Sequence, residues 1–517
     1  MTQTNPYIER TDAFMAHLAD AGYEVYRVGG SVRDEILDRY IKDADYMVRG
    51  CDLKELGDAL RLAASRETKG AVAPLKLRDG RQAGWRVSAR GLGAIEVTLP
   101  RKEVSTGPRH TDFIIDLDPE LTLEQDAERR DFTFNALYSP LGEYGDGRLS
   151  LVVAGRAISR VIDPTGRGLY DLQHKLINTT HPDSFRDDPL RTLRALRFVS
   201  TLGYDLGTET HKQMIEHAKC VDGLTATGNL SGTVYAEMCK LLMGPNVGKA
   251  LRLARDTGVL GTLFPELVPM LGHEANSRYH DMTTDEHTFL ALETAAKVDA
   301  PLEVRWALLF HDSGKPIMEW TGTDGRKHYY AYSGPDPDAT DAMREDHQVV
   351  GARQWMTAAK RLSGIPKDMR NKVERIILEH MVTIQPKNVH VKVRRARVRL
   401  GDEMLRWVLL HRMCDLTGKG PAKINQRGVE MIGTQEIIRQ AAERDGVPCS
   451  VKDLEIDGYV VMDALRNAQA RKGTNNVGKV LAAVLDEVIC DPSEQKLTRE
   501  WQQSAAERHA QKIASSS

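Results

Sequence analysis

The fold is decided by a stretch near the start of the chain that reads VYRVGGSVRD at residues 25–34 and KDADYMV at residues 42–48. These letters predict a strand, a glycine turn, a helix and a second strand that carries two carboxylates. Gly29 and Gly30 have no Cβ, so the backbone of the turn can approach a ligand closely. The free N–H groups at the start of the following helix favour an anion. The turn is therefore expected to bind phosphate.

Two aspartates follow the glycine turn, one helix later. Asp43 and Asp45 are expected to leave one face of the strand while Ala44 faces the other way, because side chains alternate along a strand. Two carboxylates side by side suit Mg²⁺. Each half has a simpler interpretation, an ordinary turn or a solvated pair of acids, but the combination predicts a site for a metal ion and phosphates.

The combination resembles the signature of the nucleotidyltransferase superfamily, in which the aspartates hold metal ions and the glycines hold the incoming triphosphate. The resemblance implies that Asp43 and Asp45 are catalytic and bind Mg²⁺, and that Arg33 helps to bind the nucleotide. Glu96 lies in the strand-forming segment IEVTL at residues 95–99 and alternates with apolar neighbours. It is a candidate for a third catalytic carboxylate, and an exposed polar position is the alternative.

The composition predicts a soluble protein of three or four domains. The chain has 517 residues, more than one hydrophobic core supports. Hydrophobic residues make up 41% and charged residues 28% of it, as in ordinary soluble proteins. The six cysteines lack Cys-x-x-Cys spacing, so neither a disulfide framework nor a zinc ribbon is expected. The sequence has no long apolar run and no apolar leader, so we expect no membrane span, no signal peptide and a cytoplasmic location.

The net charge of −2 excludes a general polyanion binder, so any contact with nucleic acid must come from local patches. Residues 387–399 form one such patch, because they carry six lysines and arginines and no acid. These residues are Lys387, Lys392, Arg394, Arg395, Arg397 and Arg399. A solvated basic face and a contact to a phosphate backbone are equally compatible with this segment.

A second motif reads RRDFTFNA at residues 129–136. Arg129 and Arg130 can neutralise phosphates, while Asp131 and Asn135 can bind ribose hydroxyls. A salt-bridged start of a helix is the simpler interpretation of such a string. The motif is, however, similar to one shared by the tRNA CCA-adding nucleotidyltransferases and the bacterial poly(A) polymerases. This resemblance implies that the four polar residues contribute to the nucleotide site.

A third motif reads FRDDPLRTLRALRF at residues 185–198 and predicts an amphipathic helix with a basic face. It resembles an element of the same family whose acid and arginine present a base-pair-like edge to the incoming nucleotide. By this resemblance Asp188 and Arg191 recognise the base, and Arg194 also belongs to the nucleotide site. Cytosine and adenine both offer an amino group beside an acceptor, so this pair of side chains suits both.

The C-terminal half carries a series of histidines and aspartates on segments that are expected to be helical. A single buried histidine is more often a core residue, but the ordered series resembles the HD phosphohydrolase domain. By that resemblance the metal ligands are His287, His311, Asp312 and Asp415 for one ion and His347 and His380 for a second. The ion is a divalent metal, with Mg, Mn, Ni and Fe all open. HD domains commonly use a metal-bound water to hydrolyse phosphate esters.

The combined resemblance implies an α+β fold. A nucleotidyltransferase head like that of polymerase beta, with a small mixed sheet, is expected at residues 1–178. All-α neck, HD and tail domains are expected at residues 179–272, 273–420 and 421–517, with tRNA contacts in the neck and tail. The implied activity is template-independent addition of the CCA end to tRNA from CTP and ATP by two-metal catalysis in the head. The HD domain is expected to trim cyclic phosphates or other phosphates.

Two alternatives stay open. A bacterial poly(A) polymerase would share the glycine turn, the aspartates and the second motif, although that family generally lacks the HD series. The other alternative is an HD phosphohydrolase whose head only binds RNA. Paired carboxylates beside bound phosphate argue against it, because they would repel RNA.

Overall fold

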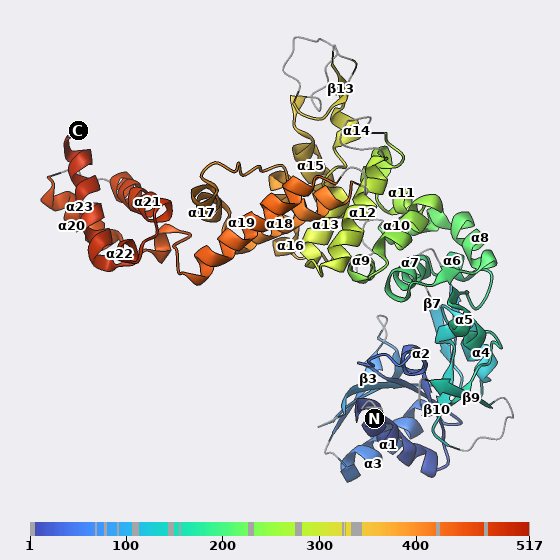
Figure 1. The fold of residues 1–517 in the computed structure, drawn as a ribbon. Helices are drawn as coiled ribbons and strands as arrows, with labels where there is room; N and C mark the ends of the chain where they lie inside the picture. Colours follow the sequence, from blue (N-terminus) through green and yellow to red (C-terminus); the bar gives the residue numbers. More distant parts are fainter. Residues whose placement is uncertain are drawn as a thin grey trace. The chain divides into compact units, whose positions relative to one another are not determined.

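The computed structural model describes most of the chain, in two compact units of residues 1–263 and 264–517 (Figure 1). The described residues are 6–67, 70–76, 80–89, 92–105, 113–142, 149–154, 157–225, 232–274, 282–322, 325, 327–331, 344–419, 424–469 and 474–515. Each unit buries apolar side chains of its own.

The first unit begins with a mixed sheet of eight strands in the order β3-β4-β5-β2-β1-β8-β10-β9. The strands are β1 (Glu24–Val28), β2 (Asp45–Arg49), β3 (Ala71–Lys76), β4 (Gln82–Ala89), β5 (Gly93–Thr98), β8 (Tyr138–Pro140), β9 (Leu149–Ala154) and β10 (Ala157–Ile162). Strand β5 runs parallel to β2, and the other neighbouring pairs are antiparallel. Strands β1, β2 and β5 are neighbours within the sheet, so residues at their ends are brought together.

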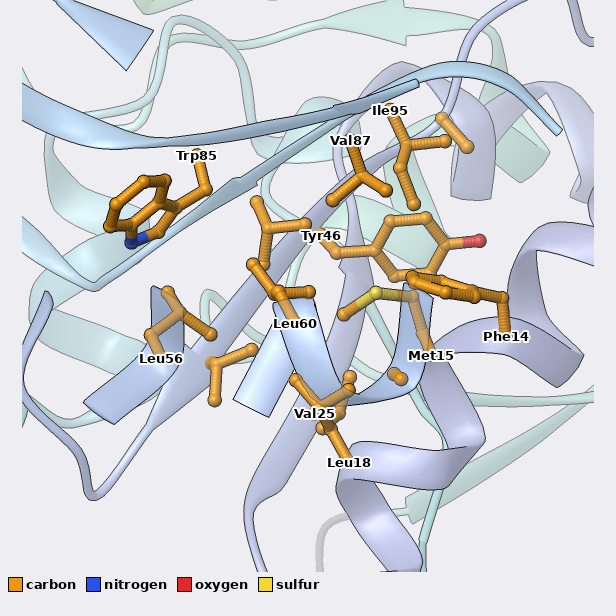
Figure 2. Packing of buried hydrophobic residues seen from close by; sticks show 14 of the residues in the cluster. Phe14, Met15, Leu18, Val25, Tyr46, Leu56, Leu60, Trp85, Val87 and Ile95 are labelled. Carbon is orange, nitrogen blue, oxygen red and sulfur yellow. The ribbon is translucent and has the colours of Figure 1, made fainter. Parts of the chain in front are cut away.

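Helices α1 (Pro6–Asp20) and α3 (Leu53–Glu67) pack against this sheet in one hydrophobic cluster (Figure 2). On α1, Phe14 and Leu18 lie one helical turn apart and are at most 1% exposed, as an amphipathic helix requires. Tyr46 of β2 is fully buried among them. Burying one such side chain contributes about 1.5–3 kcal/mol to stability. The strands that carry the carboxylates therefore rest on a tightly packed layer.

Short elements complete the head of the first unit. They are α2 (Gly30–Ile36), the hairpin of β6 (Arg101–Ser105) and β7 (Phe113–Leu117), α4 (Leu123–Glu128) and the 3₁₀ helix η1 (Thr133–Asn135). Helix α4 begins at a capping box, in which the Thr122 hydroxyl accepts from the Gln125 N–H and the Gln125 side chain accepts from the Thr122 N–H. This cap fixes the start of the segment that leads into the RRDFTFNA motif.

Helices form nearly all of the rest of the first unit. They are α5 (Gly168–His174), α6 (Ser184–Asp187), α7 (Leu190–Leu202), α8 (Thr208–Glu216), η2 (Ala218–Leu224), α9 (Thr233–Met243), α10 (Val247–Asp256) and α11 (Val259–Leu263). Pro189 lies at the N-terminal boundary of α7 without a side-chain cap, and Gly203 ends the helix with φ 75°. Strand β12 (Asp205–Leu206) pairs in parallel with β11 (Leu176–Ile177), so the segment predicted as an all-α neck includes one short strand.

The second unit is helical apart from the short pair β13 (Trp320–Thr321) and β14 (Lys327–His328), as far as it is described. Its helices are η3 (Pro265–Met270), α12 (Thr284–Lys297), α13 (Leu302–Phe310), α14 (Lys315–Met318), α15 (His347–Arg361), α16 (Lys367–Glu379), α17 (Val389–Leu400), α18 (Asp402–Thr417), α19 (Gln426–Arg444), η5 (Val451–Asp453), α20 (Gly458–Asn467), α21 (Thr474–Cys490), α22 (Glu494–Leu497) and α23 (Arg499–Ser515). The rings of Trp306, Phe310 and Trp355 pack together in its core.

The predicted α+β class, with a mixed sheet in the head and a mostly helical remainder, is confirmed. Helices α20, α21 and α23 share a separate apolar cluster at the end of the chain. The predicted boundary between HD and tail domains, at residues 420 and 421, lies outside the described residues. No helix in the described part of the chain is long and apolar enough to cross a membrane.

Candidate functional site

The glycine turn lies where β1 ends and α2 begins. Gly29 has φ 73°, a conformation that favours glycine. A Cβ added to Gly29 would lie 3.5 Å from Nη1 of Arg130, and one added to Gly30 would lie 3.5 Å from Nη2 of Arg33. Two guanidinium groups therefore flank the turn.

The three predicted carboxylates lie on neighbouring parts of the sheet. Asp45 begins β2, pairs with Val28 on one side and stands directly opposite Glu96 of β5 on the other. Asp43 lies just before the strand, and both aspartates are exposed while Ala44 is buried. Desolvation by the surrounding protein and the charge of Glu96 raise the pKa of Asp45. A divalent cation would relieve this repulsion between like charges.

Glu96 also has a partner of its own within the sheet. Nη2 of Arg86 donates to its carboxylate at 2.5 Å, and the side chains of Arg86 and Glu96 are 53% and 38% exposed. An exposed ion pair of this kind adds little to stability. The geometry therefore leaves both interpretations of Glu96 in place, a third metal ligand and a surface salt bridge.

A buried aspartate that the motifs did not single out holds both arginines of the second motif. Asp126 of α4 is fully buried and accepts from Nε of Arg129 at 2.8 Å, from Nη2 of Arg130 at 2.9 Å and from the hydroxyl of Tyr138 at 2.7 Å. Burial alone would raise the pKa of Asp126, but the two guanidinium groups hold it well below its usual range. Asp126 thus fixes Arg130 beside Gly29. In the sequence, these two ion pairs were indicated only by the i, i+3 and i, i+4 spacing of Asp126 to Arg129 and Arg130.

The other polar residues of the second motif form a chain of hydrogen bonds into α7. Nη1 of Arg33 donates to Oδ1 of Asn135 at 2.7 Å, and Nδ2 of Asn135 donates to Oδ1 of Asp131 at 3.0 Å. Nε of Arg194 donates to Oδ2 of Asp131 at 2.8 Å. Burial raises the pKa of Asp131, but Arg194 and Asn135 outweigh this effect and lower it to about 2. Four predicted nucleotide-site residues are therefore brought together.

The predicted base-recognition pair lies at the start of α7. Arg191 is buried, and its guanidinium donates to Oγ of Ser184 at 2.9 Å and to the backbone oxygen of Arg129 at 2.6 Å. Its Nε lies 3.8 Å from Oδ2 of Asp188. Desolvation raises the pKa of Asp188 to about 6, although Arg191 opposes the shift. Arg197, nearly two turns further along α7, pairs with Glu237 of α9 at 2.6 Å, so this helix face is not simply solvated.

In the second unit, the predicted HD ligands converge on one buried cluster, here called the HD centre. It consists of His287, His311, Asp312, His347, His380 and Asp415. Nε2 of His287 lies 2.9 Å from Asp415 and 3.5 Å from Asp312. On the other side of Asp312, Nε2 of His347 lies 3.7 Å from its Oδ1 and 3.2 Å from Nε2 of His380.

Backbone carbonyls orient the four histidines of the HD centre. Nδ1 of each ring lies 2.7–3.0 Å from a carbonyl oxygen, so Nδ1 donates to the backbone and Nε2 faces the centre. Burial opposes the charged form of His311, but Asp312 and Asp415 outweigh this effect and raise the pKa of His311 to about 10, so a bound cation would compete with the second proton of this ring. Burial lowers the pKa values of His347 and His380, that of His380 to about 3, so both rings are neutral. Neutral imidazoles and carboxylates form a donor set that fits divalent metal ions.

The atoms of the HD centre fall into two overlapping groups with ligand spacing. His287, His311 and Asp312 place one donor atom each within 4.8 Å of one another, and so do Asp312, His347 and His380. Asp312 belongs to both groups, and Nζ of Lys315 lies 2.6 Å from Oδ2 of Asp312. The arrangement can therefore accommodate two ions that share one carboxylate.

The basic segment 387–399 is largely engaged within the protein. Most of it forms α17, and its four arginines bind Ile489 O, Asp486, Asp402 and Glu379 respectively, in sequence order. These contacts tie α17 to α16, α18 and α21, because the partners lie on or beside those helices. Four of the six predicted cations thus have structural partners.

A glycine turn beside paired carboxylates on neighbouring strands defines a protein of the nucleotidyltransferase class. In agreement, residues 25–178 match the family "Poly A polymerase head domain", and residues 234–271 match "Probable RNA and SrmB- binding site of polymerase A". The Multifunctional CCA protein of Haemophilus ducreyi is 30% identical over 351 residues, which are 66% of this chain and 73% of that protein. The chain therefore belongs to the family of multifunctional CCA proteins, as the motifs predicted.

Two further comparisons define the extent of the likeness. The Multifunctional CCA protein of Paracidovorax citrulli is 32% identical over 296 residues, and the alignment spans 56% of this chain and 62% of that protein. The CCA-adding enzyme of Bacillus stearothermophilus, solved in complex with CTP, has a TM-score of 0.60 at 20% identity and covers 99% of this chain and 100% of that one. The structural likeness extends over both units and shows a shared fold.

Proposed function

We propose that this protein adds the CCA end to tRNA 3′ termini from CTP and ATP without a nucleic-acid template. The observation that carries the proposal is the placement of Asp45 opposite Glu96 and near Asp43, beside a glycine turn flanked by two guanidinium groups. Family membership supports it, and so does the CTP bound to the Bacillus enzyme. The match of residues 234–271 to an RNA-binding family supports an RNA acceptor.

In this proposal the carboxylates and the arginines of the head have separate roles in nucleotide transfer. Asp43 and Asp45, with Glu96 as third candidate, would hold Mg²⁺, which activates the RNA 3′-hydroxyl and stabilises the departing pyrophosphate. Arg33 and Arg130 neutralise the triphosphate at the glycine turn. Their guanidinium groups already point to the position that a Cβ would occupy, so phosphate oxygens can approach there.

The second and third motifs orient the nucleoside. Asp131 and Asn135 hold Arg33 and Arg194 in place and offer their remaining lone pairs to the ribose. Asp188 accepts from the exocyclic amine of cytosine or adenine, and Arg191 donates to the neighbouring ring acceptor. We assign this chemistry to the head and neck, residues 1–178 and 179–272, and further tRNA contacts to the tail from residue 421, with the cytoplasm as location.

The proposal is tested with a tRNA transcript that lacks its 3′ end, incubated with CTP, with ATP and with both. Two cytidines followed by one adenosine and then a stop are expected. A long adenosine ladder would instead identify a poly(A) polymerase, and no incorporation would favour a head that only binds RNA. Asp45→Asn should abolish addition with an unchanged circular dichroism spectrum, whereas Asp58→Asn, an exposed surface change, should not.

We also propose that the HD centre is a metal-dependent phosphohydrolase at residues 273–420. His287, His311, Asp312 and Asp415 would hold one divalent ion, and Asp312, His347 and His380 a second. A bound ion supplies Lewis acidity and activates water for attack on a phosphate ester. The test is hydrolysis of 2′,3′-cyclic AMP and 2′-AMP after loading with Mg²⁺, Mn²⁺, Ni²⁺ or Fe²⁺. Failure with every ion would refute this activity and leave CCA addition unaffected.

A further inference from the structure

A fifth histidine lies against the HD centre and belongs to none of its predicted ligands. His411 of α18 is fully buried, and its ring centroid lies 5.1 Å from that of His311 and 5.5 Å from that of His380. It precedes Asp415 by four residues on the same helix, so both side chains leave one face. His411 thus lies beside two residues of the proposed metal site and on the same helix face as a third.

Neither ring nitrogen of His411 has a hydrogen-bond partner among the described residues. A neutral imidazole has one donor and one acceptor, and leaving both unsatisfied in the interior is unfavourable. Such a group in a native structure points to an ion or a water molecule beside it.

His411 does not fit as a direct metal ligand. It belongs to neither set of donor atoms that lie within 4.8 Å of one another in the described structure, and its ring nitrogens make no contact of hydrogen-bond length such as the one that ties Asp415 to Nε2 of His287 at 2.9 Å. The four histidines of the HD centre cannot satisfy it either, because each has its Nδ1 on a carbonyl and its Nε2 turned to the centre. One water molecule adds about 2.8 Å of reach, which is enough to connect a nearby ring nitrogen to a coordination shell.

We infer that His411 is a positioning residue of the HD centre, which holds and orients a water molecule at the ion site through a ring nitrogen. The inference rests on the proposed metal-dependent activity of that centre. The water would have His411 and the ion as partners, with the Asp415 carboxylate within reach on the same helix face, and a buried water needs about two to four such partners. Outer-shell groups of this kind typically change activity by about 10–100-fold.

The test compares His411→Leu, His411→Gln and the matched control Met413→Leu, a volume-conserving change on the same helix, in the full chain loaded with Mn²⁺. His411→Leu is expected to lower kcat for hydrolysis of 2′,3′-cyclic AMP by about 10–100-fold with little change in KM. His411→Gln should restore part of the loss, because an amide also hydrogen-bonds to water. Water-proton relaxation of the Mn²⁺-loaded protein should decrease in His411→Leu and not in Met413→Leu.

A merely structural role gives a different pattern. If His411 only fills space, His411→Leu removes an unsatisfied buried ring, so it should raise the thermal midpoint and leave kcat and relaxation unchanged. That result, in a protein that binds Mn²⁺ and hydrolyses the substrate, overturns the inference alone. If the parental protein binds no Mn²⁺, both the proposed HD activity and the inference are wrong. CCA addition is measured in its own assay and is not affected by that result.

Discussion

Asp126→Asn should destabilise the first unit and weaken nucleotide binding, although no nucleotide was predicted to touch this residue. The substitution keeps the shape of the side chain and removes its charge. Arg129, Arg130 and the Tyr138 hydroxyl all donate to the carboxylate at 2.7–2.9 Å, and Asp126 is fully buried. An amide can accept on one side only, so at least one donor would face an NH₂ group.

The expected loss of unfolding free energy in Asp126→Asn follows from the burial and the hydrogen-bond geometry of this residue. Removing one partner of a buried ion pair costs about 3–5 kcal/mol. The side chains of Arg129 and Arg130 keep 14% and 13% exposure, and asparagine retains one acceptor, so we expect a loss near the lower end. A loss of about 3 kcal/mol corresponds to a fall of roughly 6–12 °C in the unfolding midpoint of a unit of this size. Arg130 would also leave its place beside Gly29, which should raise KM for both nucleotides about tenfold, or ~1.4 kcal/mol.

The assay is thermal unfolding followed by hydrogen exchange of peptides from α4 and β8, because a chain with two units need not unfold in one step. Asp58→Asn is the matched control, since Asp58 pairs with Arg61 on the surface with 63% of its side chain exposed. That change should cost less than about 0.5 kcal/mol. Equal midpoints for Asp126→Asn and Asp58→Asn, or unchanged KM values, would refute the reasoning.

Three further outcomes separate the proposed roles. Glu96→Gln should lower kcat for nucleotide addition at least about 100-fold if Glu96 holds metal, whereas Arg86→Ala should change it less than about twofold; equal, small effects would reduce Glu96 to a surface ion pair. Because desolvation raises the pKa of Asp188 to about 6, addition should increase with pH through about 6, and Asp188→Asn should remove that limb; an unchanged pH profile would argue against Asp188 as the base acceptor. Asp312→Asn should abolish metal-dependent hydrolysis and leave CCA addition intact, and loss of both activities would contradict two independent sites.

The local pattern of the sequence was sufficient to predict the glycine turn and the elements around it, whereas the fold class followed from the resemblance to the nucleotidyltransferases. Strand propensity, the glycine pair and alternation around Ala44 all depend on neighbours within a few residues, and β1, α2 and β2 form where they predict. The register of β5 beside β2, which brings Glu96 opposite Asp45, depends on a pairing across about fifty residues. Only an alternating pattern hinted at it, so Glu96 could be no more than a candidate.

The partners of the charged motifs could not be predicted in the same way. Whether Arg194 faces solvent or Asp131 is decided by how α7 packs on the head, and no local pattern encodes this contact. The basic segment at 387–399 shows the same limit, because its arginines find acids up to about ninety residues away. The ion pairs of Asp126 were more predictable, because its spacing to Arg129 and Arg130 places all three residues on one helix face. The sequence did not indicate, however, that Asp126 is buried.

The ion pairs of the nucleotide site imply that binding proceeds by exchange of partners. Arg33 holds Asp34 through Nε and Nη2 at 2.9 and 2.7 Å, while its Nη1 holds Asn135. Both arginines at the glycine turn are therefore already paired with an acid before a nucleotide arrives, Arg33 with Asp34 and Arg130 with Asp126. A triphosphate would compete with carboxylates for these donors, so part of its attraction is offset by the pairs it breaks. Positioning by neighbouring acids would thus give geometric precision and moderate affinity, a combination suited to the proposed site, which would accept two different nucleotides and release pyrophosphate after each addition.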